Sequence, residues 1–280
     1  MAKSEGPLLV IDGDSFAHRA YHGVPKTVRR AGGKAGNAIL GFTNYVLRLV
    51  EAESPRAVFV AWDKLSEPNW RAKELDGYQG GRIFEPEIVE QLDVLPEFIA
   101  EFGFLYGKGG NYEADDWIAS AASAEEKRGG TALVASGDRD SFQLASEAVT
   151  ILHPVKGGEM ARIGPAEVME RYGVKPDQVP DFIALRGDPS DKIPGAKGIG
   201  AVTAASLLKK YATLEDMLAD GKFGNQADDL QLYKRIATMV RDIKLPAIKS
   251  AAPDWAAGAA LARKWELNGL ADRLEKLAAG

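Results

Sequence analysis

Short apolar runs alternate with longer amphipathic stretches through the first half of the chain. The runs at 8–11, 58–62 and 132–135 hold four or five residues each, and an aspartate follows each run within three positions. Runs this short and this apolar are typical of strands covered on both faces, as in a parallel sheet. A further strand is expected at 149–152. The pattern predicts an α/β fold with a mostly parallel central sheet flanked by helices.

Apolar residues at helical spacing lie between these strands and dominate the second half of the chain. In the first half they predict helices at about 12–21, 37–53, 86–102 and 113–128. Past about Gly173 the character changes, and helices are expected at about 176–186, 201–211, 213–219, 226–242 and 255–278. We therefore expect a core at 1–173, a helical subdomain at 174–245, and C-terminal helices at 246–280 that pack back on the core.

The aspartates that follow the strands are the first candidate chemistry. Because the carboxyl ends of parallel strands meet at one sheet edge, Asp12, Asp63, Asp138 and Asp140 should gather there. The helix that opens at 113–116 adds three more acids, although a helix N-terminus favours negative charge for structural reasons alone. A single aspartate after a strand is equally well explained as a helix cap or an Asx turn. Crowded carboxylates raise one another's pKa values and a bound cation relieves this, so their number indicates a metal site.

Composition narrows the kind of metal site. The 280 residues include no cysteine, which excludes disulfides, thiolate zinc sites and cysteine nucleophiles. With three histidines, the site is left to carboxylates, which favour hard cations such as Mg²⁺ or Mn²⁺. Taken alone, the net charge of −5 argues against nucleic acid as a partner. If nine carboxylates serve the metal site, however, the rest of the chain carries +4, so the net charge of the whole chain is a poor guide to its partner. No apolar signal core or membrane-spanning run is evident, so cytoplasmic localisation is the default expectation.

Three further segments suit nucleic acid. The connection at 64–85 is long and rich in aromatic and basic residues, which favours stacking on bases beside backbone phosphates, with simple flexibility as the alternative. The basic, glycine-rich loop at 26–36 is equally typical of a solvated loop. The glycine-rich turn at 195–200 opens a helix, which makes it a natural phosphate seat. It is neither a Walker loop nor a dinucleotide fingerprint.

One interpretation of the acids is a phosphatase of the haloacid dehalogenase type. The run Asp12-Gly13-Asp14-Ser15 resembles the nucleophile motif of that class, with Asp12 attacking phosphorus and Asp14 acting as acid and base. This alternative gives no role to Asp63, to the acids at 113–116 or to the glycine-rich turn.

A second resemblance uses all of these features. Five motifs in order resemble the bacterial 5′-nuclease family, which comprises the N-terminal 5′→3′ exonuclease domain of DNA polymerase I and its stand-alone flap endonuclease relatives. The motifs are Ile11-Asp12-Gly13, Trp62-Asp63, Tyr112-Glu113-Ala114-Asp115-Asp116, Ser136-Gly137-Asp138-Arg139-Asp140 and the run from Gly187 to Gly195. The resemblance implies a PIN-like nuclease core with a helix-hairpin-helix (H3TH-type) subdomain. It places the metal-site acids of the family on Asp12, Asp63, Glu113, Asp115, Asp116, Asp138, Asp140, Asp188 and Asp191.

The resemblance also implies that residues 64–85 form an arch over the active site, here called the arch segment. A lysine is usual after Tyr78, whereas this chain has Gln79, so Arg71, Lys73 or Arg82 is expected to stabilise the scissile phosphate. Lys192 stands where asparagine is common, and Asn111 where glycine is common. The expected DNA contacts are Arg19, Lys26, Arg29, Arg30, Lys34, Trp70, Tyr78, Gly195, Lys197, Gly198, Gly200 and Thr203.

The function expected from the resemblance is a stand-alone 5′→3′ exonuclease and 5′-flap endonuclease in primer removal and repair. It would hydrolyse DNA phosphodiesters with two or more Mg²⁺ or Mn²⁺ ions, with K⁺ at the helix-hairpin-helix. The expected partners are DNA with 5′ ends or flaps and RNA–DNA primers, with no membrane and a monomeric chain. A non-catalytic DNA-structure binder is the remaining alternative, and loss of metal ligands would favour it.

Overall fold

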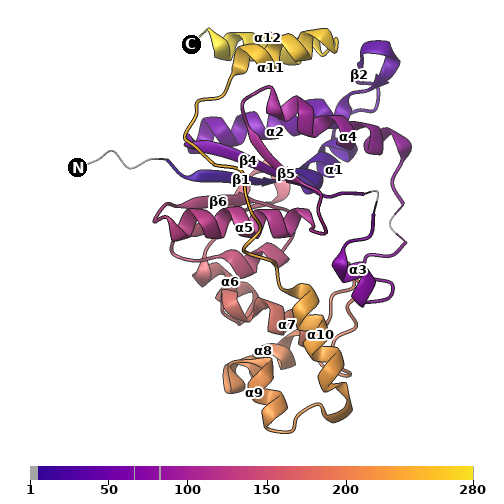
Figure 1. The fold of residues 1–280 in the computed structure, drawn as a ribbon, viewed down its shortest axis with the longest axis vertical. Coiled ribbons are helices and arrows are strands. Elements are labelled where there is room, and N and C mark those ends of the chain that lie inside the picture. The colour runs from indigo at the N-terminus through magenta and orange to yellow at the C-terminus, as the bar shows by residue number, and fades with distance from the viewer. Residues whose placement is uncertain (1–5, 66, 82, 280) are drawn as a thin grey trace, which may run out of the picture.

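A six-stranded sheet forms the centre of the computed structural model, which describes residues 6–65, 67–81 and 83–279 (Figure 1). The strand order is β5-β4-β1-β6-β7-β8, and only β8 runs antiparallel to its neighbour. The strands are β1 (Leu8–Asp12), β4 (Ala57–Trp62), β5 (Leu105–Lys108), β6 (Ala132–Ala135), β7 (Val149–Pro154) and β8 (Met160–Ile163). The predicted α/β fold with a mostly parallel sheet is confirmed. β5 and β8, at the two sheet edges, were not predicted.

Helices cover both faces of the sheet, which explains why every residue of β1 is buried. One face carries α1 (Gly13–Gly23), α2 (Asn37–Glu53) and α4 (Pro86–Ala100), and the other carries α5 (Ala114–Lys127) (Figure 1). Side chains alternate between faces along a strand. Leu9 and Ile11 therefore pack in the α1–α2–α4 layer, whereas Leu8 and Val10 pack with α5.

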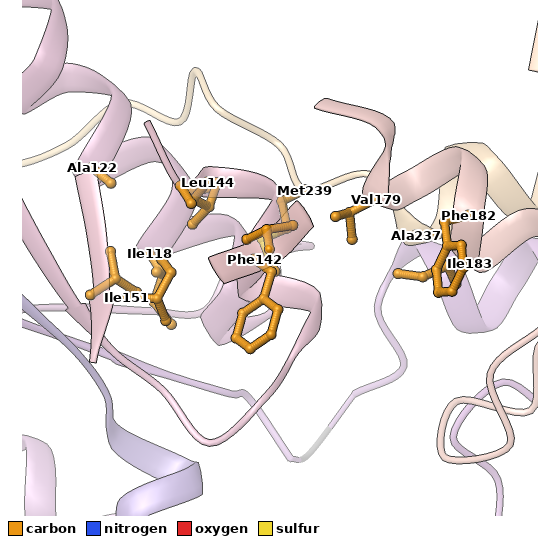
Figure 2. Packing of buried hydrophobic residues seen from close by; sticks show 14 of the residues in the cluster. Ile118, Ala122, Phe142, Leu144, Ile151, Val179, Phe182, Ile183, Ala237 and Met239 are labelled. Atoms are coloured by element: carbon orange, nitrogen blue, oxygen red, sulfur yellow. The ribbon is translucent and has the colours of Figure 1, made fainter. Parts of the chain in front are cut away.

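Residues 165–237 form helices that lie below the sheet in Figure 1. These helices are α6 (Pro165–Tyr172), α7 (Val179–Arg186), α8 (Ala201–Tyr211), α9 (Leu214–Ala219) and α10 (Ala227–Ala237). Figure 2 shows Phe142 and Met239 between Ile118 of α5 and Phe182 of α7, and all four belong to one buried cluster. The helical part and the α5 face of the sheet therefore share a hydrophobic core.

The chain after α10 differs from the prediction. The helix expected to about 242 ends at Ala237, because the N–H groups of Met239 and Val240 donate to side chains of the core instead of continuing the helix. Residues 238–254 form neither helix nor strand and lead to α11 (Trp255–Lys264) and α12 (Asn268–Ala278), where one helix was expected. Glu266, with φ of 60°, lies in the turn between them. The pair packs on α4, where Trp265 stacks on Phe98.

Shorter elements complete the described chain. The basic loop forms a hairpin of β2 (Arg29–Arg30) and β3 (Lys34–Ala35), and the arch segment contains α3 (Trp70–Glu74). Single 3-10 turns lie at Ala31–Gly33, Asp140–Leu144, Lys156–Gly158, Pro176–Gln178 and Gly224–Gln226. Across the described residues, none of the helices has the length and apolar character that a membrane crossing requires.

Candidate active site

A cavity of about 330 Å³ opens at the carboxyl edge of the sheet. We call it the acidic pocket, because its lining includes the carboxylates Asp12, Asp14, Asp63, Glu113, Asp115 and Asp138. Gln79 of the arch segment, Ser15 and His18 also line it. The strand-end aspartates thus meet acids from the start of α5, which is the gathering that the strand pattern predicts.

Burial and mutual repulsion make these carboxylates costly to ionise. Burial raises the pKa of Asp12 to about 7, and the nearby charges of Asp63 and Asp138 add to the shift. Burial likewise raises the pKa of Glu113 to about 7, against the opposing effect of Arg71. The pKa of Asp115 also lies well above its usual range, because of burial first and the charge of Asp138 second. A divalent cation bound here would relieve this repulsion, and the hard oxygen donors suit Mg²⁺ or Mn²⁺.

Hydrogen bonds hold the pocket acids in place. Asp12 Oδ1 accepts from Ser15 N–H at 3.0 Å and so caps α1, while its Oδ2 accepts from Ser136 Oγ–H at 2.7 Å. Asp63 Oδ1 accepts from the N–H of Ala114, the first residue of α5, at 2.7 Å. Asp12 therefore both caps α1 and lines the acidic pocket. Within the described residues, no three Asp, Glu or His side chains already form a metal-binding group.

Asp116 lies behind the pocket in a different environment. It is fully buried, and its two oxygens accept from both terminal nitrogens of Arg71 at 2.7 Å, from Val240 N–H at 2.9 Å and from Glu113 N–H at 3.2 Å. These four donors fill its acceptor positions. This arrangement argues against the expectation that Asp116 is a direct metal ligand and places it instead as a link between segments.

Arg71 completes this group, which we call the Arg71 cluster (Arg71, Glu113 and Asp116). Its guanidinium also donates to Glu113 at 2.9 Å, to Ile236 O at 2.8 Å and to Thr238 O at 3.1 Å, and the residue is 2% exposed. With its donors occupied and its surface covered, Arg71 cannot contact a substrate phosphate. The structure contradicts that expectation. Of the other two named cations, Lys73 is exposed, and Arg82 lies outside the described residues.

The remaining acids lie beside a second cavity of about 320 Å³, which shares Gly137 and Asp138 with the acidic pocket. Asp138, Asp140 and Asp188 line it, together with Arg186. Asp188 pairs with Arg186 at 3.2 Å and accepts from Ser190 N–H at 2.7 Å. Burial raises the pKa of Asp140 well above its usual range, and the charge of Asp138 adds to this.

Asp191 lies at the junction with the arch segment. Its Oδ1 accepts from Gln79 Nε2 at 3.1 Å, and its backbone carbonyl accepts from Gln79 N–H at 3.3 Å. The Tyr78 hydroxyl donates to Glu113 at 3.2 Å, and its ring is buried in the core. Trp70 is half-buried beside the Arg71 guanidinium, 4.6 Å from its ring centroid. The burial of Tyr78 contradicts its expected stacking on DNA bases.

Four expected DNA contacts near the β2–β3 hairpin are paired with carboxylates at the start of α4. The pairs are Lys26–Glu85 at 2.6 Å, Arg29–Glu87 at 2.7 Å, Arg30–Glu90 at 3.0 Å and Lys34–Glu90 at 3.0 Å. Exposed pairs contribute little stability, so Lys26, Arg29 and Lys34 can exchange a carboxylate for a phosphate. Arg30 is buried against Trp265, which contradicts its expected role.

The other expected contacts are accessible. Arg19 is exposed, with its Nε 3.3 Å from the point where a Cβ on Gly137 would stand, at the rim of both cavities. The turn before α8 exposes Lys197, Gly198 and Gly200, with Gly195 half-buried, and the first turn of α8 exposes Thr203. Gly195 and Gly198 have φ of 76° and 77°, a left-handed conformation that glycine adopts without strain.

The sequence interpretation of the metal site omitted Asp14. Its Oδ2 accepts from Asp63 N–H at 2.7 Å, and burial raises its pKa well above the usual range. Asp14 stands on the first turn of α1, two residues after Asp12, so its side chain reaches the same sheet edge. That spacing could have identified Asp14 as part of the site, and the phosphatase interpretation did give it a role.

Comparisons with known proteins agree on one family. Residues 7–173 match the model of the 5′-3′ exonuclease N-terminal resolvase-like domain, and residues 174–255 match the 5′-3′ exonuclease C-terminal SAM fold. DNA polymerase I of Mycobacterium tuberculosis strain H37Rv is 37% identical over 248 residues, covering 87% of this chain and 27% of that protein. The thermostable DNA polymerase I of Thermus aquaticus is 35% identical over 251 residues, covering 86% and 29%. The chain thus spans about a quarter of the length of these polymerases.

Solved structures share the fold. The T5 5′-exonuclease with bound zinc superposes with a TM-score of 0.68 at 17% identity, covering 97% of this chain and 99% of that one. The catalytic core of Rad2 in complex with DNA substrate has a TM-score of 0.63 at 14% identity, covering 98% and 92%. The family matches span most of the chain, and they replace the phosphatase interpretation of Asp12 and Asp14. This chain belongs to the 5′-3′ exonuclease family.

Proposed function

We propose that the chain hydrolyses DNA phosphodiesters at 5′ ends and at 5′ flaps, with two or more Mg²⁺ or Mn²⁺ ions. The observation that carries this proposal is the acidic pocket, where carboxylates from β1, β4, α5 and the loop after β6 meet at one sheet edge. The proposed organisation is a nuclease core at 1–173 that includes the arch segment, a helix-hairpin-helix subdomain at 174–245, and packed C-terminal helices at 246–280.

The proposed ligands fall into two groups. Asp12, Asp63, Glu113 and Asp115 would hold one ion, and Asp140, Asp188 and Asp191 would hold another, with Asp138 lining both cavities. When bound, paired divalent ions lower the pKa of water and stabilise the attacking and leaving oxygens of a phosphodiester.

The surrounding residues position these carboxylates. Ser15 and Ser136 fix the two oxygens of Asp12, and Ala114 N–H fixes Asp63. Gln79 holds Asp191 through its side-chain amide. Because these contacts come from several elements, the geometry of the pocket depends on the whole fold.

Two accessible features support DNA binding. The exposed turn before α8 offers backbone N–H groups at a helix N-terminus, which suits a phosphate and carries no base specificity. Arg19 at the pocket rim suits a phosphate close to the scissile bond. We further propose K⁺ at the hairpin carbonyls, activity as a monomer in the cytoplasm, and a role in primer removal and repair that includes RNA–DNA primers.

A 5′-flap oligonucleotide labelled at either end tests the proposal. We expect a cut near the junction of single and double strands with Mg²⁺ or Mn²⁺, and no cut in excess chelator. Asp138→Asn should lower the rate at least about a hundredfold, because a charge that acts on the transition state contributes this much. Asp93→Asn, on the exposed face of α4, is the matched control. Cleavage in chelator would contradict the metal mechanism, and binding without cleavage would favour the non-catalytic alternative.

A further inference from the structure

The end of the arch segment meets a tight turn of the helical part at the mouth of the acidic pocket. The turn at 188–193 is closed by two backbone hydrogen bonds of 2.8 Å between Asp188 and Ile193. Gln79, which lines the pocket, donates to Asp191 of this turn through both its backbone N–H and its side chain. The turn and the arch end are therefore fixed against each other beside the pocket.

Two residues at this junction have an unusual backbone conformation. Gln79 and Lys192 are left-handed, with φ of 49° and 58°. This conformation costs free energy for residues other than glycine, and such residues occur preferentially at functional sites. Both segments thus place a residue with a strained backbone at the junction beside the acidic pocket.

The Lys192 ammonium crosses the junction. Its Nζ lies 3.6 Å from the point where a Cβ on Gly81 would stand, so the side chain extends from the turn to the end of the arch segment. Lys192 is exposed and forms no ion pair with any residue that the structure describes. By contrast, Arg71 and Arg186, which also border the site, are both paired with carboxylates.

A phosphodiester that approaches the acidic pocket needs positive charge at its mouth, because both partners are anionic. Gln79 cannot supply this charge, since its amide is neutral and already holds Asp191. Lys192 directly follows Asp191 in the chain, and its ammonium group has three N–H donors that suit a phosphate.

We propose that Lys192 binds a backbone phosphate of the DNA strand that enters between the arch end and the acidic pocket. The proposal rests on the function proposed above and adds a specific substrate-binding residue to it. Since the contact is between opposite charges, its contribution to substrate binding is larger at low salt and falls as the salt concentration rises.

The test compares Lys192→Asn with Lys192→Arg and with Lys276→Asn, a control on the exposed surface of α12. Asparagine tolerates the left-handed conformation, so Lys192→Asn should fold normally, which circular dichroism checks. We expect kcat/KM on a 5′-flap DNA to fall about 10- to 100-fold, the range for one charged hydrogen bond. Lys192→Arg should keep most of the activity, and Lys276→Asn should match the parent.

Salt dependence separates a phosphate contact from a structural effect. The slope of log(1/KM) against log salt should become shallower by about 0.7 to 0.9 in Lys192→Asn and stay unchanged in Lys276→Asn. An unchanged slope, or activity of Lys192→Asn within twofold of the parent, would overturn the proposal for Lys192. Failure of the parent chain to cut flap DNA with either Mg²⁺ or Mn²⁺ would instead overturn the proposed function.

Discussion

Asp115 and Asp116 are neighbours on the first turn of α5, yet they belong to opposite environments. Asp115 lines the acidic pocket, where burial and the charges of Asp138, Asp12 and Glu113 raise its pKa. Asp116 points into the Arg71 cluster, where donors fill its acceptor positions. In the acidic pocket, burial and neighbouring carboxylates raise the pKa of Asp115, whereas in the Arg71 cluster the guanidinium pairs with both oxygens of Asp116.

This difference shows how the fold assigns roles to identical residues. A carboxylate surrounded by other carboxylates is costly until a cation arrives, so it is suited to bind one. A carboxylate matched by a bidentate arginine is already satisfied, and it joins the segments that supply its partners. The Arg71 cluster ties the arch segment, the start of α5 and the chain after α10 together directly behind the acidic pocket.

Breaking the Arg71 cluster should have the largest effect on stability. Asp116→Ala leaves the Arg71 guanidinium buried and unpaired on that side, and we expect a loss of about 3–5 kcal/mol in the free energy of unfolding. Urea unfolding followed by circular dichroism measures this loss. Asp115→Ala is the adjacent control and should change the unfolding free energy little while abolishing cleavage. Equal destabilisation by the two variants would refute the contrast between pocket and cluster.

The strand-end acids were predictable because they depend on local pattern. Short apolar runs imply a parallel sheet, and the sheet brings Asp12, Asp63 and Asp138 to one edge whatever the rest of the chain does. The contrast between Asp115 and Asp116 was not predictable, since it depends on Arg71, 45 residues earlier in the chain. Sequence spacing shows that both lie on the first turn of a helix, but it does not show which partner each meets.

The other differences between the sequence predictions and the structure have the same physical origin. Lys26, Arg29 and Lys34 resemble a free basic loop, yet their partners lie 56 to 59 residues away on α4 or directly before it. The helix expected to 242 stops early because core side chains take the N–H groups of Met239 and Val240. In each case a tertiary contact overrides the local preference.

The pH dependence of stability sharpens the comparison, because two carboxylates of the acidic pocket have raised pKa values. The pKa values of Asp12 and Glu113 rise from 3.8 and 4.5 to about 7 in the folded state. Between those values the folded chain holds protons that the unfolded chain has lost, so stability must fall as pH rises. We expect the melting temperature in chelator to drop between pH 5 and pH 8.

Divalent metal should reverse this trend. With millimolar Mg²⁺, the ionised carboxylates become ligands, and the melting temperature should hold or rise over the same pH range. Each proton coupled to unfolding contributes at most about 1.4 kcal/mol per pH unit, which sets the size of the effect. Asp12→Asn should reduce the slope measured in chelator. A melting temperature that rises with pH in chelator would show that the pocket acids are ionised without cost.

The smallest expected effect concerns Asp14, whose role in the acidic pocket combines charge with a hydrogen bond. Its Oδ2 accepts from Asp63 N–H at 2.7 Å, and Asp63 in turn accepts from Ala114 N–H. Asp14→Asn removes the charge and keeps an acceptor, whereas Asp14→Ala removes both. If Asp14 acts by positioning Asp63, Asp14→Ala should cost about 1 kcal/mol in unfolding free energy and lower cleavage, while Asp14→Asn stays near the parent. If the two variants lose cleavage equally and differ little in stability, Asp14 acts through its charge and belongs with the metal-binding carboxylates.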